Sequence, residues 1–414
     1  MKKLIGNAIF GQSGGPTSVI NSSAAGVFTE ALKQSGAIEK VYGAAHGIKG
    51  ILEEKFYDIG LEDPYEIELL KTTPSSALGS CRYKLKDASV DDTDYTRIVE
   101  VFKKYNIRYF FYNGGNDSMD TCNKISKFMQ KADWECRVMG VPKTIDNDLF
   151  GTDHCPGFSS AAKYIATSTM EVYLDARVYD TGMITVIEIM GRNAGWLTAA
   201  TAVSAFKGHG PDLIYLPEID FDIDQMLEDV KKIYEKNLKC IIAVSEGVKS
   251  ADGRYIPELV GTVDRDAFGH AQLGGAATIL ANYLKEKIGC KVRGIEFSLL
   301  QRCASHCASK RDVEEAYLAG QTAVKSAVDG MTDYMVGCYR PESGEYRFDI
   351  KLIPLDEVAN TERKIPRNWI NEAGNGLLQP YIDYVLPLIQ GESCPPMEDG
   401  VPRFARLKKI LASK

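Results

Sequence analysis

Several common sequence signatures are missing from this chain of 414 residues. No apolar run reaches the roughly 18 residues that a membrane-spanning helix needs. The start, MKKLIGNAIFGQSGG, has a short apolar part that Asn7 interrupts, and it lacks an A-x-A cleavage site, so we interpret it as a buried strand. The net charge is −7 and no basic run offsets it. We therefore expect neither a membrane nor a nucleic acid as partner.

Metal-binding and redox cysteine motifs are also missing. The ten cysteines contain no C-x-x-C pair, so neither a zinc ribbon nor a thioredoxin-like motif is indicated. The densest group, QRCASHCASK, holds Cys303, His306 and Cys307 but lacks a second ligand pair for zinc. We interpret the cysteines as reduced thiols, which predicts a cytoplasmic protein.

Strand-like and helix-like segments alternate along most of the sequence. Apolar runs predict strands at 4–10, 107–113, 137–142, 183–190, 212–217 and 239–247. Helical spacing lies between them at 19–36, 119–131, 161–176 and 223–237. This βαβ alternation predicts an α/β fold with largely parallel sheets, and the number of strands favours two sheets. Beyond residue 330 we expect a hairpin, 334–341 and 346–355 around a turn at 342–345, and then an irregular tail.

The first candidate site motif is GQSGGP, residues 11–16, between the first strand and the first helix. A glycine-rich turn at this place presents backbone N–H groups and a positive helix end to an anion. Gly14 and Gly15 would permit a close approach. The motif is neither a Walker loop nor G-x-G-x-x-G, and a plain tight turn is an equally good interpretation of it alone.

Two further motifs follow predicted strands and carry polar side chains. NGGNDS, residues 113–118, places Asn116 and Asp117 at the carboxyl edge of the sheet, where open α/β folds bind ligands. Helix capping by either residue is the alternative. In PKTIDND, residues 142–148, Asp146 and Asp148 are two positions apart and would share one side of an extended segment. Surface acids are the alternative there, but the neighbouring Lys143 and Thr144 favour a site.

Four arginines could grip phosphate. Arg82 lies in LGSCR, Arg192 in a glycine-bracketed turn, and Arg293 and Arg302 in VRGIEFSLLQR. The planar guanidinium binds phosphate oxygens in pairs. Each arginine alone is more often a surface residue, but together they suggest phosphate at both ends of a reaction.

Seven of these motifs, in order, resemble the phosphofructokinase family over nearly the whole chain. They are GQSGGP, LGSCR, GGNDS, PKTIDND, MGR, SEG and the VR…QR segment. The resemblance, together with the alternation, implies two doubly wound Rossmann-like α/β domains with the active site in the cleft between them. We expect a phosphoryl-donor domain of residues 1–157, rejoined by roughly 301–365. A sugar-phosphate domain would comprise 158–300 with roughly 366–414.

The resemblance also implies a role for each matched residue. Asp146 would be the base that accepts the proton of the sugar's 1-hydroxyl, with Thr144 and Asp148 orienting that hydroxyl. Gly14 would face the transferred phosphoryl group, and Arg82 would contact the donor. The sugar-phosphate site would comprise Met190, Gly191, Arg192, Glu246 and Arg302. Arg293 would reach a neighbouring subunit, which implies a homodimer or homotetramer.

Two residues resemble the pyrophosphate-dependent branch of that family. Pyrophosphate users carry lysine at the place of Lys143, where ATP users carry glycine, and the extra charge suits a small anion. Asp117 also replaces a glycine of the ATP users and would exclude a nucleotide by bulk and like charge.

The predicted reaction is reversible phosphoryl transfer from pyrophosphate to fructose 6-phosphate, giving fructose 1,6-bisphosphate and phosphate, a step of glycolysis. Mg²⁺ is the expected cofactor. Asn116 stands at the family's magnesium-associated aspartate and would hold the ion with Asp117. An ATP-dependent enzyme and a non-catalytic regulatory subunit of the same fold remain the alternatives.

Overall fold

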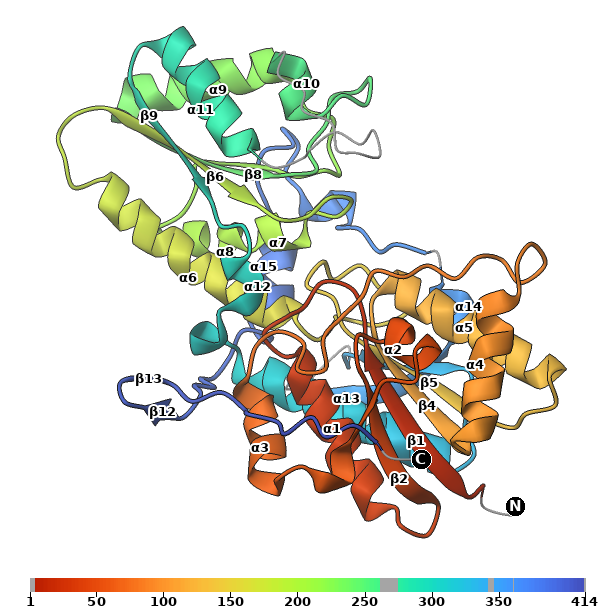
Figure 1. Cartoon of the computed structure of the whole chain (residues 1–414). Helices are drawn as coiled ribbons and strands as arrows, with labels where there is room; N and C mark the ends of the chain where they lie inside the picture. Colours follow the sequence, from red (N-terminus) through yellow and green to blue (C-terminus); the bar gives the residue numbers. More distant parts are fainter. Residues whose placement is uncertain (1–3, 261–274, 342–345, 360, 413–414) are drawn as a thin grey trace. The chain divides into compact units, whose positions relative to one another are not determined.

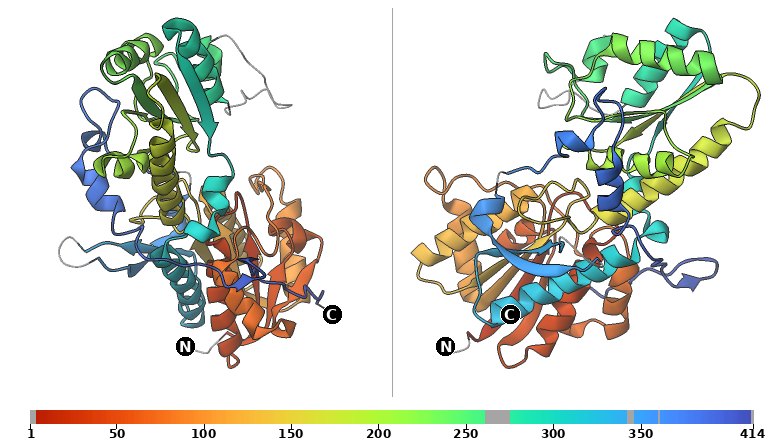
Figure 2. Two further views of the ribbon diagram at one scale, coloured as in Figure 1. Left: turned by 90° about the vertical axis from the view of Figure 1, so that its left-hand side faces the viewer. Right: turned by 180° about the vertical axis from the view of Figure 1, so that it is seen from behind.

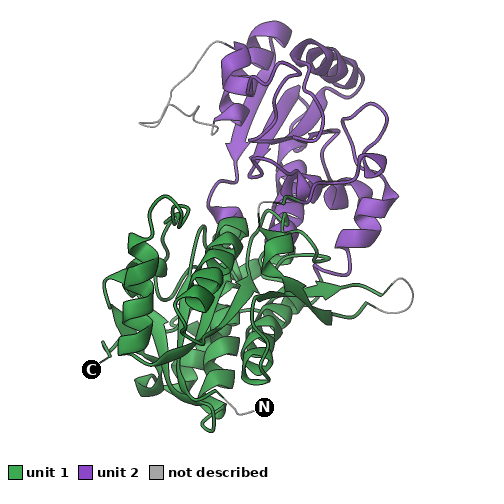
Figure 3. Ribbon diagram, turned by 90° about the vertical axis from the view of Figure 1, so that its right-hand side faces the viewer, with its two compact units in different colours: residues 1–160, 302–362, 390–414 green, residues 161–301, 363–389 purple. Residues whose placement is uncertain are grey.

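The computed structural model describes residues 4–260, 275–341, 346–359 and 361–412. The chain folds into two compact units, each built from separated stretches of sequence (Figure 3). Unit 1 comprises Met1–Ser160, Arg302–Glu362 and Gln390–Lys414, and unit 2 comprises Ala161–Gln301 and Arg363–Ile389. The division expected from the sequence differs chiefly in the tail, because residues 390–414 belong to unit 1, where they bond to its outermost strand.

Unit 1 is built around a seven-stranded sheet in the order β11-β10-β5-β4-β1-β2-β3 (Figure 1). The strands are β1 Gly6–Gln12, β2 Ile38–Ala44, β3 Phe56–Asp58, β4 Ile107–Gly114, β5 Arg137–Pro142, β10 Tyr334–Tyr339 and β11 Asp349–Pro354. The five inner strands run parallel, and β3 and β11 are antiparallel edges. The predicted hairpin is therefore confirmed as β10 and β11, while its predicted turn at 342–345 lies outside the described residues.

Helices cover both faces of this sheet. The helices of unit 1 are α1 Ile20–Lys33, α2 Ile48–Leu52, α3 Pro64–Leu69, α4 Thr93–Lys104, α5 Asn116–Lys131, α13 Lys310–Val328 and α14 Leu355–Val358, with short 3₁₀ turns Ile59–Leu61, Leu70–Thr72 and Ser305–Cys307. Alternate residues of β1 explain the layers: Ile9 packs with α4 and α5, and Phe10 packs with α1 and α13. A strand buried on both faces needs a nearly continuous apolar run, which IRYFFYNG of β4 supplies.

Unit 2 holds a smaller, parallel sheet in the order β7-β8-β6-β9. Its strands are β6 Met183–Ile189, β7 Leu213–Tyr215, β8 Lys239–Ser245 and β9 Lys291–Glu296. Its helices are α7 Trp196–Ala199, α8 Thr201–Phe206, α9 Ile223–Asn237, α10 Ile256–Val260, α11 Ala276–Ile288, α15 Gln379–Val385 and the turn Arg367–Trp369. Helices α9 and α11 pack on one face of the sheet, and α7 and α8 lie on the other (Figure 1).

The remaining elements join or extend the units. Helices α6 Phe158–Ala176 and α12 Leu300–Cys303 each contain a boundary between the units, and β12 Met397–Glu398 pairs with β13 Val401–Pro402 in the tail. The α/β class, the mainly parallel strands and the presence of two main sheets are confirmed. Among the described helices, none is long and apolar enough to cross a membrane.

Candidate active site

Three of the predicted motifs meet at one edge of the sheet of unit 1. Strands β1, β4 and β5 are parallel neighbours, so the loops that follow their carboxyl ends must lie side by side. Two backbone hydrogen bonds join these loops: Ser13 N donates to Asn113 O at 2.9 Å, and Lys143 N donates to Gly114 O at 3.0 Å. The motifs GQSGGP, NGGNDS and PKTIDND therefore form one cluster.

Lys143 places a cation against the glycine-rich loop. Its side chain is buried, and its Nζ donates to Gly15 O at 2.6 Å. Gly14 has φ +74°, which favours glycine, and a Cβ at this residue would lie 3.3 Å from that Nζ. Burial lowers the pKa of Lys143 to about 8, and the opposing attraction of Asp146 is smaller. The loop and the lysine thus expose a positive centre to any small anion bound beside Gly14.

Two arginines add to this positive field. Arg82 and Arg302 each further lower the pKa of Lys143 by charge repulsion, so their guanidinium groups lie near its ammonium. A Cβ at Gly15 would lie 3.1 Å from Arg302 Nη1. Arg302, which the resemblance assigns to the sugar-phosphate site, therefore lies beside the donor loop in unit 1.

The segment after Lys143 is held by a second stretch of chain. Thr144 N donates to Pro156 O at 3.2 Å, and Thr144 forms a parallel bridge with Gly157. Thr144 Oγ1 accepts from Asp146 N at 3.1 Å, which closes a tight turn directly before the predicted base. The threonine therefore fixes the backbone of Asp146.

Asn147 corrects the sequence argument about the two aspartates. It adopts φ +56°, and its Oδ1 accepts from Cys155 N at 2.9 Å. The segment is thus turned rather than extended, and strand alternation is the wrong reason to place Asp146 and Asp148 together. The two carboxylates nevertheless interact, since the charge of Asp146 helps raise the pKa of Asp148.

Asn116 and Asp148 form a half-buried polar pair. Asn116 Nδ2 donates to Asp148 Oδ2 at 3.2 Å, whereas Oδ1 of each residue is buried without a hydrogen-bond partner. Burial, followed by the charge of Asp146, raises the pKa of Asp148 to about 6. Two unpaired buried oxygens are costly unless something binds them, so this pair fits a hard cation.

Asp117 does not join that pair. Its side chain is exposed in the first turn of α5, and the N-cap residue of this helix is Gly115, so neither Asn116 nor Asp117 is the cap. The capping alternative is therefore wrong for both residues. Within the described ranges, no group of three His, Cys, Asp or Glu side chains is arranged to hold a metal.

Unit 2 brings three of the sugar-phosphate residues together at the carboxyl ends of β6 and β8. Glu246 N donates to Ile189 O at 3.0 Å, and Glu246 Oε1 accepts from Gly191 N at 3.3 Å. Gly191 has φ +141°, and its carbonyl accepts from Ser245 Oγ at 2.5 Å. Met190 lies between Ile189 and Gly191 and is part of the same turn.

The two predicted site arginines of unit 2, Arg192 and Arg293, are exposed. Arg192 follows Gly191, and its backbone is closely packed: a Cβ at Gly247 would lie 1.9 Å from Arg192 O. Arg293 lies on β9, one of the two edge strands, and its Nη1 is 3.5 Å from Asp175 Oδ2. Both guanidinium groups are thus open to a further ligand.

The sequence argument missed two residues of unit 1, Gln12 and Asn21. Both are fully buried, and Gln12 Nε2 donates to Asn21 Oδ1 at 3.0 Å. Gln12 Oε1 accepts from Leu78 N, and Asn21 Oδ1 accepts from Ala77 N, so the pair holds the segment that leads to Arg82. Asn21 could have been found from the sequence, because it is an amide on the apolar face of a predicted helix.

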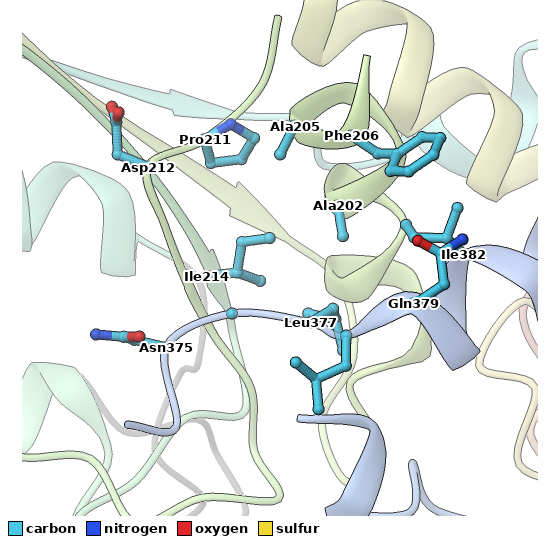
Figure 4. Close-up of a pocket in the computed structure, with 12 residues that line it drawn as sticks. Ala202, Ala205, Phe206, Pro211, Asp212, Ile214, Asn375, Leu377, Gln379 and Ile382 are labelled. Carbon is cyan, nitrogen blue, oxygen red and sulfur yellow. The ribbon is translucent and has the colours of Figure 1, made fainter. Parts of the chain in front are cut away.

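A cavity of about 270 Å³ lies elsewhere in unit 2, between α8, β7 and the start of α15 (Figure 4). Apolar side chains such as Ala202, Ile214 and Ile382 line much of it. Its one acid, Asp212, already accepts from Ile241 N at 2.8 Å. None of the predicted site residues lines this cavity.

Comparison with known proteins agrees with the geometry of the site. The phosphofructokinase family model matches residues 7–296. A pyrophosphate–fructose 6-phosphate 1-phosphotransferase of Halomonas elongata is 45% identical over 406 residues, 97% of this chain and 96% of the relative. One of Methylococcus capsulatus is 42% identical over 99% of this chain and 97% of the relative. The crystal structure of a pyrophosphate-dependent phosphofructokinase from Marinobacter aquaeolei superposes with a TM-score of 0.90 at 41% identity, covering 99% of this chain and 98% of that one.

Proposed function

Because the chain belongs to the phosphofructokinase family, we propose that it transfers a phosphoryl group reversibly from pyrophosphate to the 1-hydroxyl of fructose 6-phosphate. The products are fructose 1,6-bisphosphate and phosphate. The observation that carries the choice of donor is the buried Lys143 ammonium, which bonds to the glycine-rich loop at Gly15. A small anion offers few contacts to a protein. A preorganised charge beside Gly14 would therefore supply the binding energy that contacts with adenosine supply for ATP.

The donor would lie at the loops of unit 1. Its phosphate oxygens would meet Lys143 and Arg82, with Gly14 allowing the close approach that a side chain would block. Charge dispersal of this kind is the main task in phosphoryl transfer, because the transition state spreads negative charge over the transferred group. Arg302, beside Gly15, is placed to stabilise the same charge.

Asp146 would act as the general base. Its backbone is fixed by Thr144, and its side chain is partly exposed, so a substrate hydroxyl can reach it. The carboxylate would accept the proton of the 1-hydroxyl as that oxygen attacks phosphorus and the bond to the leaving phosphate breaks. In the reverse direction Asp146 would return the proton.

Asp117 would restrict the donor to pyrophosphate. It lies exposed in the first turn of α5, where Asn116 separates it from Gly114 and Gly115. A carboxylate at this place repels a longer polyphosphate and fills space that a nucleotide would need. ATP-dependent transfer is the alternative donor, and Asp117 and Lys143 both disfavour it.

Mg²⁺ is part of the proposal. Asn116 and Asp148 would hold the ion or its waters through their unpaired Oδ1 atoms, and Asp117, the other residue expected at the ion, lies exposed next to Asn116. When bound, the ion would neutralise charge on the donor phosphates. Asp148 would need to be ionised for this, and the neighbouring cation would favour its charged form.

The acceptor would be held by Met190, Gly191, Arg192 and Glu246, with Arg293 serving a neighbouring subunit. Support for a homodimer or homotetramer comes from the outermost strand β9 and from Leu174, Val178 and Tyr179, which are exposed close to Asp175 in sequence. Exposed strand edges and apolar side chains favour association. All ten cysteines lie in the described ranges and none of them forms a disulfide, which supports a reducing cytoplasm.

The test is an assay for fructose 1,6-bisphosphate with Mg²⁺, fructose 6-phosphate and either pyrophosphate or ATP. We expect turnover with pyrophosphate and little with ATP, and formation of pyrophosphate in the reverse direction. Turnover with ATP alone would retain the family and contradict the donor assignment. Sugar-phosphate binding without turnover from either donor would support the non-catalytic subunit instead.

A further inference from the structure

The C-terminal tail lies along β3, one of the two edge strands of the main sheet of unit 1. Asp58 N donates to Ile410 O at 2.9 Å, Ala412 N donates to Phe56 O at 2.8 Å, and Tyr57 forms an antiparallel bridge with Leu411. The dark blue trace that ends at C in Figure 2 runs beside the red and orange elements of this unit. The tail therefore covers the edge of β3, which would otherwise expose unpaired backbone groups.

Two carboxylates anchor the tail from the segment that follows β3. Glu62 is 7% exposed and accepts from the backbone N–H groups of both Lys408 and Lys409 at 2.7 Å. Glu66, on α3, accepts from the guanidinium of Arg403 and from the backbone N of Arg406. Hydrogen bonds that end on an ionised carboxylate are among the stronger ones, so this attachment is specific.

Thr73 is the innermost point of the attachment. Its Oγ1 accepts from Ala405 N at 2.9 Å and donates to Leu69 O at 2.8 Å. Thr73 directly follows the 3₁₀ turn Leu70–Thr72, where the chain leaves the helical region and enters the loop 73–82. The tail is thus bonded to the first residue of the loop that carries Arg82.

That loop holds the glycine of the donor site. The Thr73 carbonyl accepts from Asn21 Nδ2 at 3.0 Å, and Leu78 N donates to Gln12 Oε1 at 3.0 Å. At the far end, Ser80 Oγ donates to Gly14 O at 2.6 Å, and Gly14 N donates to Cys81 O at 3.1 Å. Both backbone polar groups of Gly14 are therefore bonded to the loop that begins at Thr73.

We propose that residues 403–412 are a strap that positions the donor loop 73–82, with Thr73 as the positioning residue that connects them. The strap would set the affinity for the small phosphoryl donor and leave the acceptor site and the base unaffected. A small anion is gripped by few groups, so a slight shift of Gly14 and Arg82 weakens its binding markedly. The inference rests on the proposed function, since the donor is taken to be pyrophosphate.

The first test compares Thr73→Val with Thr73→Ser in the full-length chain. Valine keeps the shape and loses the hydroxyl that accepts from Ala405, whereas serine retains it. We expect Thr73→Val to raise the KM for pyrophosphate about three- to tenfold, with kcat and the KM for fructose 6-phosphate within about twofold of the parent. Thr73→Ser should match the parent. A chain ended after Pro402 should show the same selective rise, at least as large.

A second readout does not depend on activity. Hydrogen exchange should be faster at the amides of Gly14, Ala77 and Leu78 in Thr73→Val and in the shortened chain, while amides of β4 stay protected. If the parent has no activity with pyrophosphate, the proposed function fails, and faster exchange would still support the strap. Unchanged exchange would contradict the strap. A parallel fall in melting temperature, kcat and the affinity for both substrates would also contradict it, because it would indicate structural support alone.

Discussion

The candidate site residues of the two units differ in how they are held. In unit 1, Lys143, Asn116 and Asp148 lie in buried or half-buried surroundings, and burial shifts the pKa of the lysine down and that of the aspartate up. In unit 2, Arg192 and Arg293 are exposed, and only the turn of Gly191 and Glu246 is tightly bonded. The difference suggests that the small donor meets the poorly solvated charge of Lys143 beside the exposed Arg82, whereas the larger sugar phosphate is met by arginines still in water.

The largest effect should come from removing the base. Asp146→Asn keeps the shape of the side chain and removes its ability to accept a proton. We expect kcat to fall about 10³-fold, with the affinity for fructose 6-phosphate nearly unchanged, because general-base work is lost and acceptor contacts are not. Steady-state kinetics and equilibrium binding of fructose 6-phosphate measure the two. Turnover within tenfold of the parent would mean that another group is the base.

A smaller loss is expected when the buried cation of unit 1 is removed. Lys143→Met replaces the ammonium with an apolar group of similar length. The value of kcat/KM for pyrophosphate should fall about 100-fold, because one desolvated charge on the phosphates is lost. Lys143→Arg is the matched control: it keeps the charge but changes its geometry, so its loss should also be substantial. An unchanged kcat/KM in Lys143→Met would remove the basis of the donor assignment.

The exposed arginine of unit 2 should matter less. Arg192→Ala should raise the KM for fructose 6-phosphate about tenfold and leave the KM for pyrophosphate unchanged, because the side chain serves the acceptor alone. Its stability should remain within about 0.5 kcal/mol of the parent, as expected for a solvated side chain. A rise in the KM for pyrophosphate instead would contradict the assignment of the donor to unit 1 and of the acceptor to unit 2.

Donor choice offers a gain of function. Lys143→Gly combined with Asp117→Gly should admit ATP at a low rate, because the repelling carboxylate and the space-filling ammonium are both gone. The assay is the same one with ATP in place of pyrophosphate, and each single variant is the control. If the double variant gains nothing with ATP, other residues close the nucleotide pocket.

The smallest effect concerns the stability of Lys143→Met. This substitution should lower activity but raise the free energy of unfolding. The pKa of Lys143 is about 8 in the folded chain and ordinarily 10.5, so folding disfavours its charged form. The buried charge of Lys143 therefore lowers the free energy of unfolding of the parent, and this loss is complete below pH 8. The loss disappears as the pH rises through 10.5, above which the lysine is neutral in both states. Lys143→Met should raise the free energy of unfolding by about 1–3 kcal/mol at pH 7, and the gain should vanish near pH 10.5. Chemical denaturation at both pH values measures it; a loss of stability at pH 7 would show that the lysine is well compensated.

Much of the fold was readable from local pattern. The predicted strands correspond to β1, β4, β5, β6, β7 and β8, and hydrophobic periodicity placed the helices between them. Three strands of the two main sheets were not predicted: the inner strand β2 and the edge strands β3 and β9. Strand β3 has only three residues, and β9 alternates weakly and is mostly exposed. The tail could not be assigned, since its bonds to Glu62, Glu66 and Thr73 join residues more than 300 positions apart.

The sequence by itself determined the α/β class and placed three motifs after predicted strands, and the ends of parallel strands share one edge of a sheet. Only the tertiary structure decided which atoms face each other there. It paired Asn116 with Asp148 by a hydrogen bond, turned the chain at Asn147, and placed Arg302 beside Gly15. Local propensity sets the path of each segment, whereas burial and long-range hydrogen bonds set side-chain partners, and those depend on residues far away in the chain.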